Sequence, residues 1–455
     1  MDNRALNKTD KVKNDEFYTQ IPDIERKCSH YKVPLKDKTV FIMYIMIAFF
    51  AASCAAFSFR AEEPRFIPDD FLGVSPDRSP LKEKDYALLD ELNATWTRRT
   101  LRWSSVEKEQ GKWNFDYWDK YVDDGKAAGK KLLITLGFDN PYLYKNHKEH
   151  RDLTEKELPF FLEYVEKTVL RYKGKVDAWE IWNEPNLHFW KGSDARFFAL
   201  AKATAQRIRE VDPTAKIASA AFWRAPERFI RGMFEIGAME YVDAVSFHPY
   251  ALSPAGAVKL FDKLAKILAD YDFKGEIWST EVGYPTSGVY PTRVSENNFP
   301  SHIIKTIAGL AARGSRTVVW YELQNDHNKG QEPSKLNSEA FFGIVYPDLS
   351  YRNGAYAYRL CGRYLAGAEY VPPQNIPKSV TALFFRREGE NILILWSERP
   401  MKARLSPAGN VIPLIHSIDS SAPPLPAPSV LTITRAPMFI TWEGETMDFQ
   451  LIKSN

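Results

Sequence analysis

Short apolar runs alternate with amphipathic segments along most of the chain, between residues 71 and 321. An apolar run of roughly four to eight residues bounded by Gly, Pro or Asp is typical of a buried strand, and apolar residues three and four positions apart are typical of a helix. Strands that alternate with helices predict a parallel sheet. The expected strands cover residues 71–74, 97–103, 131–138, 176–183, 216–222, 242–247, 276–280 and 316–321.

Eight strands with helices between them indicate an α/β fold, the (β/α)8 TIM barrel, which we assign to residues 60–368. The active site of such a barrel forms at the carboxyl ends of its strands. Beyond a helix expected near residues 353–365, prolines and glycines separate short alternating runs, among them 391–396, 430–434 and 438–442. Alternation is typical of antiparallel strands, so residues 369–455 are predicted to form a small C-terminal antiparallel β-sandwich.

Residues 39–59 carry no charged side chain. As a helix that rises about 1.5 Å per residue, this stretch reaches roughly the 30 Å of a bilayer core, which predicts an N-terminal transmembrane helix. The polar residues 1–38 before it are too many for the short charged region of a signal peptide, and they predict a disordered tail. Cleavage as a signal peptide near Ala56 and lipidation at Cys54 are the alternatives.

The charges beside this segment predict its orientation. Lys32, Lys36 and Lys38 precede it, and no positive excess follows it. Positive charge stays on the cytoplasmic side, so we expect a single-pass membrane protein with a cytosolic N-terminus and a periplasmic or extracellular barrel. If the segment is cleaved instead, the protein is secreted.

Composition and charge narrow the function classes. The formal net charge is +3, from 61 basic and 58 acidic residues, and no long basic run contains interleaved aromatics, which argues against a nucleic-acid partner. The three cysteines lack the spacing of a zinc site, and His147 and His150 lie in a charged loop without further ligands at metal-site spacing. We therefore expect neither a metal nor a cofactor.

Two apolar runs that end in a glutamate carry the chemistry. Trp182-Asn183-Glu184-Pro185 closes the fourth predicted strand, and Ser279-Thr280-Glu281 closes the seventh. Glycoside hydrolysis needs two carboxylates, because one protonates the leaving oxygen while the other attacks or supports the electron-poor sugar carbon. The pair predicts a carbohydrate-active enzyme with Glu184 and Glu281 as its catalytic residues.

These motifs resemble the signature of clan A glycoside hydrolases, in which the first glutamate is the acid/base and the second the nucleophile. Further matches are Trp96-Thr97-Arg98, His248-Pro249-Tyr250 and Trp320-Tyr321-Glu322-Leu323, after the second, sixth and eighth strands. Within the clan the chain is most similar to family 39 and family 39-like enzymes, whose barrels often carry a small β-domain. The resemblance implies a retaining mechanism with a covalent intermediate on Glu281 and no cofactor.

The resemblance also implies partners for the nucleophile. Arg98 and Tyr250 would keep Glu281 ionised, with Arg102 as a rival for the role of Arg98 because both lie on the same strand face. His248 would orient this network.

Substrate contacts are expected from two further residues. Asn183 would hydrogen-bond the sugar 2-hydroxyl, an interaction that strengthens toward the transition state. Trp320 is the candidate floor on which the sugar stacks, whereas Trp103 is expected to pack the barrel rim.

The predicted function is therefore a retaining glycoside hydrolase that cleaves O-glycosidic bonds of an oligo- or polysaccharide, in envelope or exopolysaccharide metabolism. Two alternatives stay open. One is a catalytically silent glycan-binding or scaffold protein that partners a polysaccharide export machinery. The other is a transglycosylase that uses the same covalent intermediate and excludes water.

Overall fold

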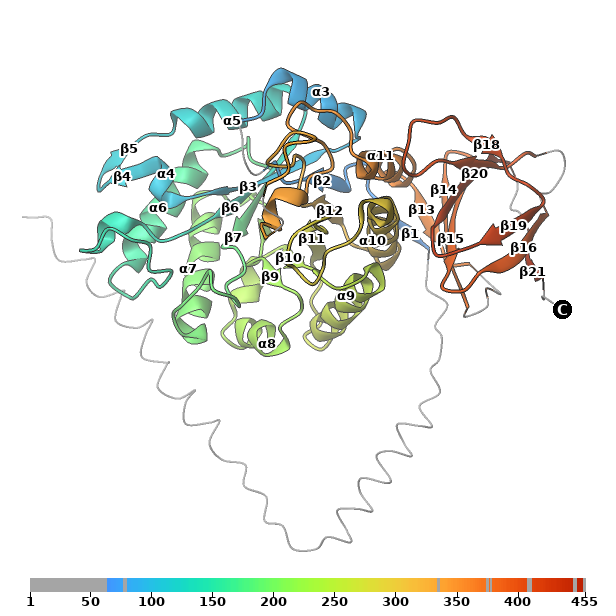
Figure 1. Ribbon diagram of the computed structural model, residues 1–455. Coiled ribbons are helices and arrows are strands. Elements are labelled where there is room, and N and C mark those ends of the chain that lie inside the picture. The colour runs from blue at the N-terminus through green and yellow to red at the C-terminus, as the bar shows by residue number, and fades with distance from the viewer. Residues whose placement is uncertain are drawn as a thin grey trace, which may run out of the picture. The chain divides into compact units, whose positions relative to one another are not determined.

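The computed structural model describes residues 64–76, 80–333, 336–373, 376, 379–406, 411–444 and 448–452. Residues 63–455 belong to one compact unit, in which a barrel ringed by helices is joined to antiparallel sheets (Figure 1). The predicted tail and the predicted transmembrane helix, residues 1–38 and 39–59, lie outside the described residues. Within the described ranges, no helix combines the length and the apolar character that crossing a bilayer requires.

The parallel strands close into a barrel, as predicted. Their order is β11-β12-β2-β3-β6-β7-β8-β10-β9, and β10 also pairs with β11, which joins the ends of the sheet. The strands are β2 (Leu72–Val74), β3 (Trp96–Leu101), β6 (Lys131–Leu136), β7 (Ala178–Ile181), β8 (Ile217–Ala218), β9 (Phe222–Trp223), β10 (Ala244–His248), β11 (Glu276–Val282) and β12 (Thr317–Trp320).

One predicted strand, residues 216–222, is interrupted. It forms the two short strands β8 and β9, and Ala221 between them makes an isolated parallel bridge with Asn183 in the loop that follows β7. The N–H of Ala221 donates to the carbonyl of Trp182 at 3.2 Å, and the N–H of Glu184 donates to the carbonyl of Ala221 at 2.8 Å. The interrupted strand is therefore bonded, through the carbonyl of Ala221, to Glu184, a predicted catalytic residue.

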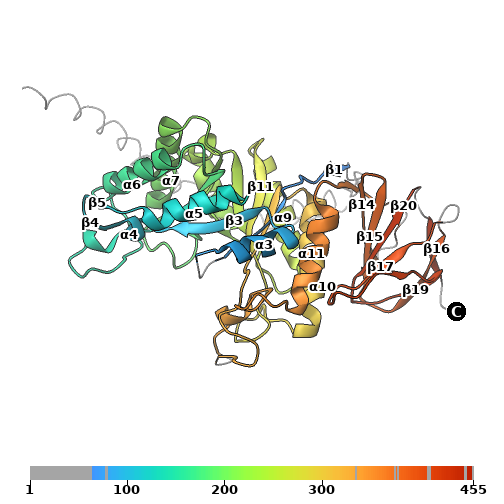
Figure 2. The same cartoon turned by 90° about the horizontal axis from the view of Figure 1, so that it is seen from above.

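Helices cover the outside of the barrel (Figure 2). The helix α9 starts where the sequence places a capping residue: the Ser253 hydroxyl accepts a hydrogen bond from the N–H of Gly256, and Pro254 occupies the first turn. The helices are α3 (Glu83–Glu91), α4 (Trp103–Val106), α5 (Asp116–Ala127), α6 (Leu158–Arg171), α7 (Asp194–Val211), α8 (Glu227–Glu235), α9 (Pro254–Ala269), α10 (Phe299–Arg313) and α11 (Asn353–Leu365).

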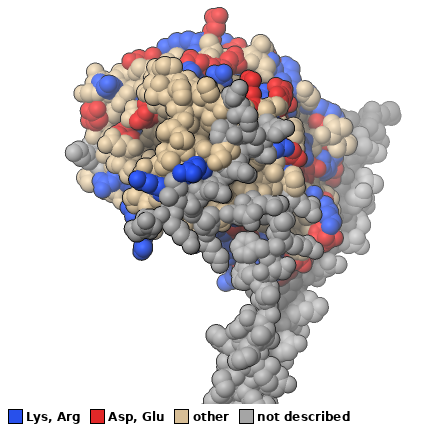
Figure 3. Space-filling model, turned by 90° about the vertical axis from the view of Figure 1, so that its right-hand side faces the viewer, with Lys and Arg blue, Asp and Glu red and all other residues tan. Residues whose placement is uncertain are grey.

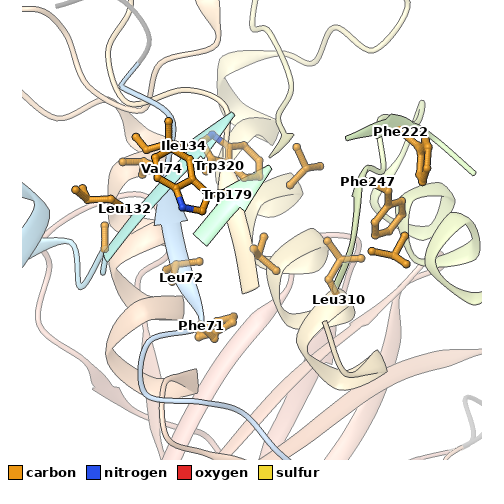
Figure 4. Packing of buried hydrophobic residues seen from close by; sticks show 14 of the residues in the cluster. Phe71, Leu72, Val74, Leu132, Ile134, Trp179, Phe222, Phe247, Leu310 and Trp320 are labelled. Carbon is orange, nitrogen blue, oxygen red and sulfur yellow. The ribbon is translucent and has the colours of Figure 1, made fainter. Parts of the chain in front are cut away.

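Two apolar layers hold the barrel. Inside it, the large rings of Trp96 and Trp278 meet edge to face at 5.3 Å. They share a buried cluster with Leu133 and three small residues, Ala178, Ala218 and Ala244, so large and small side chains fill the interior together. Outside it, strand residues pack against the helices in the main core, part of which Figure 4 shows. Polar side chains occupy the barrel interior between this apolar layer and the carboxyl ends of the strands.

The C-terminal residues form two antiparallel sheets, as predicted for the β-sandwich. Between the sheets lies a second apolar core that includes Leu395, Ala403, Leu431 and Ile440. Figure 3 looks onto this side of the molecule and shows a broad uncharged surface with charged side chains around it. The strands are β13 (Glu369–Val371), β14 (Val380–Arg387), β15 (Glu390–Ser397), β16 (Met401–Ser406), β17 (Leu414–His416), β18 (Leu425–Pro426), β19 (Val430–Ile433), β20 (Met438–Glu443) and β21 (Asp448–Ile452).

The domain boundary differs from the prediction at one point. Residues from 60 onward were assigned to the barrel, but β1 (Arg65–Phe66) pairs antiparallel with β13 and extends the larger C-terminal sheet. Backbone bonds beside the pair continue the contact, since the N–H of Ile67 donates to the carbonyl of Ala368 at 2.8 Å. Residues 65–67, which lead into the barrel, are therefore bonded to residues 368–370, which follow its last helix.

Candidate active site

Glu184 and Glu281 lie together at the carboxyl end of the barrel. Glu184 follows β7 and is 7% exposed, and Glu281 is the penultimate residue of β11. One oxygen of each carboxylate and one ring nitrogen of His248 all lie within 4.8 Å of one another. The fold thus brings together two side chains that are 97 residues apart in the sequence.

A β-bulge turns Glu281 into the site. Strict alternation along β11 would point it away from the barrel interior, because Thr280 already faces inward and contacts Ser246. The pairing of β11 with β12 shifts register between Ser279 and Val282, so the carboxylate of Glu281 also reaches the interior. Bulges of this kind are common beside active sites, where they redirect a side chain.

Two residues of the turn that carries the Glu184 side chain have left-handed backbone conformations. Trp182 has φ 62° and Glu184 has φ 42°, a region that non-glycine residues enter at a cost of about 1–3 kcal/mol each. Backbone bonds from both residues to neighbouring strands hold this conformation: Trp182 donates to Leu136 and Glu184 to Ala221. The turn fixes where the Glu184 carboxyl group points.

Arg98 on β3 connects the two halves of the site. Its Nη1 donates to Glu281 at 2.7 Å, and its Nη2 donates to the side-chain carbonyl of Asn183 at 2.8 Å. Its Nε and Nη2 donate to one oxygen of Glu180 at 2.9 and 2.7 Å. The guanidinium is thereby shared between two carboxylates.

Glu180 is a site residue that the sequence analysis missed. It is fully buried on β7, and its carboxylate accepts hydrogen bonds from the hydroxyls of Thr135 and Ser246, each at 2.6 Å. Burial is the largest single effect and would raise the pKa of Glu180, but the charge of Arg98 and the hydrogen bonds from Arg98 and Ser246 act together to hold the pKa below its usual value. A glutamate inside an otherwise apolar strand was the available signal, since a buried carboxylate needs a cationic partner.

The two candidate catalytic carboxyl groups have different electrostatic surroundings. Burial raises the pKa of Glu184 to about 7, and Arg98 opposes the rise only in part. Burial also raises the pKa of Glu281, but the charge of Arg98 and the hydrogen bond from Tyr250 favour its ionised form. With a guanidinium 2.7 Å away, Glu281 is the member of the pair that keeps its negative charge.

His248 and Tyr250 take the places predicted for them beside the carboxylates. The Nδ1 atom of His248 lies 2.7 Å from Glu184 and 3.8 Å from Glu281, and burial lowers the pKa of this histidine to about 4, so the ring is neutral. The phenol of Tyr250 donates to Glu281 at 2.9 Å. Together with Arg98 and Asn183, both residues belong to the same hydrogen-bonded site.

Two sequence expectations are wrong. Trp320 is fully buried and packs against Tyr284 and Phe299 in the layer between barrel and helices, among the core residues of Figure 4, so no sugar reaches it. Arg102 does not share the strand face of Arg98, because β3 ends at Leu101. It caps α4, and its side chain, 46% exposed, pairs with Glu149.

Tyr321, one residue further along, is the partly exposed aromatic at this strand end. Its phenol donates to Glu339 at 3.1 Å, and the phenol of Tyr290 donates to the other oxygen of Glu339 at 2.7 Å. The charge of Glu339 contributes to the raised pKa of Glu184. Tyr321 could have been predicted, because side chains alternate along β12 and Tyr321 faces the opposite way from Trp320. No sequence pattern indicates Glu339.

The loop after β11 is joined to the loop that carries Glu339. The hydroxyl of Ser338 accepts hydrogen bonds from the backbone N–H groups of Val289 and Tyr290 at 2.8 and 3.0 Å. The long loop of residues 139–154 borders a hollow of about 450 Å³. That hollow contains none of the predicted site residues.

Glu184, His248 and Glu281 offer three atoms with metal-like spacing. Arg98 argues against a cation there, because its guanidinium already occupies one oxygen of Glu281 and would repel a second positive charge. The donor set suits proton transfer and nucleophilic attack better than metal binding.

Comparisons with known proteins place the chain near one family. Residues 101–276 match the model "Glycosyl hydrolases family 39". Residues 5–43, outside the described part, match "Adenine-specific methyltransferase EcoRI". The aryl-phospho-beta-D-glucosidase BglA of Bacillus subtilis (strain 168) is 26% identical over 187 residues, so the match spans 38% of this chain and 38% of that relative.

Solved structures share the fold. A family 39 glycoside hydrolase from Bacteroides cellulosilyticus WH2 has a TM-score of 0.68 and 21% identity, over 82% of this chain and 81% of that one. A monomeric beta-xylosidase from Caulobacter crescentus CB15 has a TM-score of 0.61 and 16% identity, over 85% and 98%. The predicted resemblance to family 39 is confirmed.

Proposed function

From this resemblance to family 39 glycoside hydrolases, we propose that the chain hydrolyses O-glycosidic bonds of an oligo- or polysaccharide with retention of configuration. The observation that carries the proposal is the spacing of Glu184 and Glu281, which have oxygens within 4.8 Å. Retaining enzymes hold their carboxyl groups about 5–5.5 Å apart, whereas inverting enzymes separate them by about 6.5–9.5 Å to admit a water molecule. The spacing supports the retaining arrangement.

The first step forms a glycosyl-enzyme. Glu184, kept protonated by its raised pKa, gives its proton to the glycosidic oxygen, and the bond between that oxygen and the anomeric carbon breaks. Glu281 attacks the same carbon and forms an ester with it. Arg98 and Tyr250 hold the attacking carboxylate in one orientation, so little reorganisation is needed when the bond forms.

The second step releases the sugar. Glu184, now ionised, takes a proton from water while the water oxygen attacks the anomeric carbon and Glu281 leaves. The proton on Glu184 and the carboxylate of Glu281 are both restored. His248 stays neutral throughout and positions Glu184 through the 2.7 Å contact.

Contacts to the sugar in the cleavage subsite come from residues beside the two carboxylates. The amide of Asn183, fixed by Arg98, is placed to contact the 2-hydroxyl. Tyr321 replaces Trp320 as the aromatic beside that sugar, supported by the edge-to-face contact with Phe342 at 5.2 Å.

Covalent trapping tests the proposal. The soluble part, residues 60–455, is incubated with a panel of 2-deoxy-2-fluoro glycosyl fluorides, and the intact mass is measured. A single glycosyl adduct mapped to Glu281 is expected, and Glu281→Gln is expected to show none. Glu163→Gln, on the exposed face of α6, serves as the control that must label like the wild type.

Transglycosylation is the second outcome that the same experiment distinguishes. Product analysis with an added acceptor sugar separates transfer to the acceptor from transfer to water. A folded protein that takes no label and digests no polymer would instead favour the silent glycan-binding scaffold.

We also propose that residues 39–59 anchor the enzyme in the membrane, where it would act on an envelope polysaccharide near the export machinery. The support is the uncharged length of this segment and the lysines before it. Fractionation of cells that express the full chain tests this: the intact protein should sediment with membranes and resist extraction at high salt. A soluble product cleaved near Ala56 contradicts it.

A further inference from the structure

Trp223 ends the short strand β9 beside the catalytic pair. It lies in register with His248 of the neighbouring strand β10, and residues paired in this way point their side chains to the same face of a sheet. The preceding residue, Phe222, points the other way and packs against Phe229 of α8. Trp223 therefore shares the face from which His248 contacts Glu184.

Asn186 fixes the position of Trp223. Its side-chain amide donates to the carbonyl of Trp223 at 2.9 Å, and its side-chain oxygen accepts from the N–H of Trp223 at 3.0 Å. Asn186 is two residues after Glu184, whose own N–H bonds to Ala221 at 2.8 Å. Three hydrogen bonds thus connect the end of β9 to the turn that carries the acid/base.

The exposure of Trp223 is unusual in this chain. The structure describes all twelve tryptophans, and nine of them are buried. Of the three partly exposed ones, Trp113 lies in the hairpin of β4 (Glu107–Glu109) and β5 (Lys112–Trp113), and Trp396 lies in the C-terminal sheet. Trp223 alone stands at the carboxyl end of a barrel strand, with the guanidinium of Arg224 5.4 Å from its ring.

We propose that Trp223 forms the floor of a subsite for the leaving-group sugar of an oligosaccharide. This inference rests on the proposed function. The nucleophile Glu281 lies under the sugar that is transferred, so the sugar that departs must lie beyond the acid/base Glu184. The backbone of Trp223 is bonded to the turn that carries Glu184, and an indole face suits the apolar face of a pyranose ring.

Acceptor-dependent turnover of the trapped enzyme tests the subsite directly. An acceptor sugar must occupy the leaving-group subsite to take the glycosyl group from Glu281, whereas fluoride, the leaving group of the labelling reagent, needs no such subsite. The probes are the 2-deoxy-2-fluoro glycosyl fluorides for labelling, followed by cellobiose, xylobiose and gentiobiose as acceptors. The rate of adduct loss is followed by intact mass.

Trp223→Ala is expected to label at a rate within about threefold of the wild type and to lose about tenfold of the acceptor-driven turnover. Trp223→Phe should recover most of that loss, because an aromatic face remains. Trp113→Ala, the matched control, should behave as the wild type in both reactions.

Four outcomes overturn the inference. If labelling and acceptor-driven turnover of Trp223→Ala fall equally, Trp223 only supports Glu184. If neither falls, or if no acceptor speeds turnover of the wild type, its ring contacts no leaving-group sugar. If the wild type takes no label, both the proposed function and the subsite are wrong. If the wild type is labelled, a negative result for Trp223 concerns the subsite alone.

Discussion

The buried pair of Arg98 and Glu180 makes the sharpest prediction, through the substitution Glu180→Gln. The side chains are 4% and 0% exposed, and one carboxylate oxygen accepts two bonds from the guanidinium and one from Thr135. Glutamine keeps the shape of the side chain but removes its negative charge. The buried guanidinium of Arg98 then loses one of its two carboxylate partners.

The expected size of the effect follows from burial. Removing one partner of a buried ion pair costs about 3–5 kcal/mol, because the remaining charge stays desolvated. Arg98 keeps its bond to Glu281, which places the loss near the lower end, about 3 kcal/mol. At about 2 °C per kcal/mol for a large domain, the melting temperature should fall by about 6 °C.

Thermal unfolding of the soluble part measures this change. Glu163→Gln is the matched control: its side chain is 53% exposed and lies 3.5 Å from Lys167, a surface pair worth about 0–1 kcal/mol. A melting temperature of Glu180→Gln within about 1 °C of that control would refute the argument that the buried pair stabilises the barrel.

The same variant has a functional readout that a loss of stability alone does not give. Without the charge of Glu180, Arg98 favours the ionised form of Glu281 more strongly, because one carboxylate fewer shares its charge. The pKa of Glu281 should fall, so the acid limb of kcat/KM should move to lower pH. An unmoved acid limb would mean that the guanidinium does not couple the two carboxylates.

The remaining predictions concern the site. Because Glu184 acts as an acid with a pKa of about 7, kcat/KM should fall about tenfold per pH unit above that value, and a flat profile up to pH 9 contradicts the assignment. Tyr250→Phe removes a hydrogen bond to a charged group worth about 1.5–3 kcal/mol, so labelling at Glu281 should slow roughly 10–100-fold; an unchanged rate refutes the role. Arg102→Ala should keep kcat/KM within about twofold, since its partner is a surface carboxylate. Dialysis against EDTA should leave activity unchanged, and a loss that Zn²⁺ restores would show that the glutamates and His248 bind a metal.

The barrel and its two glutamates could be predicted because each depends on a local pattern. Apolar runs specify where strands begin, and parallel strands of a barrel bring their carboxyl ends to one rim, so residues at strand ends meet whatever their separation in sequence. Glu184 and Glu281 follow from this rule, whereas His248 and Tyr250 were expected from the resemblance to clan A glycoside hydrolases.

The errors arise where local geometry departs from the average strand. Arg102 was placed on the face of Arg98 by alternation, but β3 ends one residue earlier and the chain turns into α4. Trp320 was chosen for its ring size, although alternation along β12 turns it toward the helices.

Contacts between distant strands were out of reach for a different reason. The partners of Glu180 come from β3, β6 and β10, and no local pattern in any one of them indicates the others. Likewise, Glu339 reaches the site only because its loop bonds to the loop after β11 through Ser338.

The pairing of β1 with β13 has a mechanical consequence. A pull applied to the chain at residue 64 loads β1 first, and β1 is held by the two-residue ladder to β13 and by the bond from Arg65 to the carbonyl of Ala312. These contacts lie on the C-terminal sheet and on α10. Tension from upstream is therefore transmitted to the scaffold around the barrel before it reaches β2, and the strands that carry the catalytic groups are shielded from it.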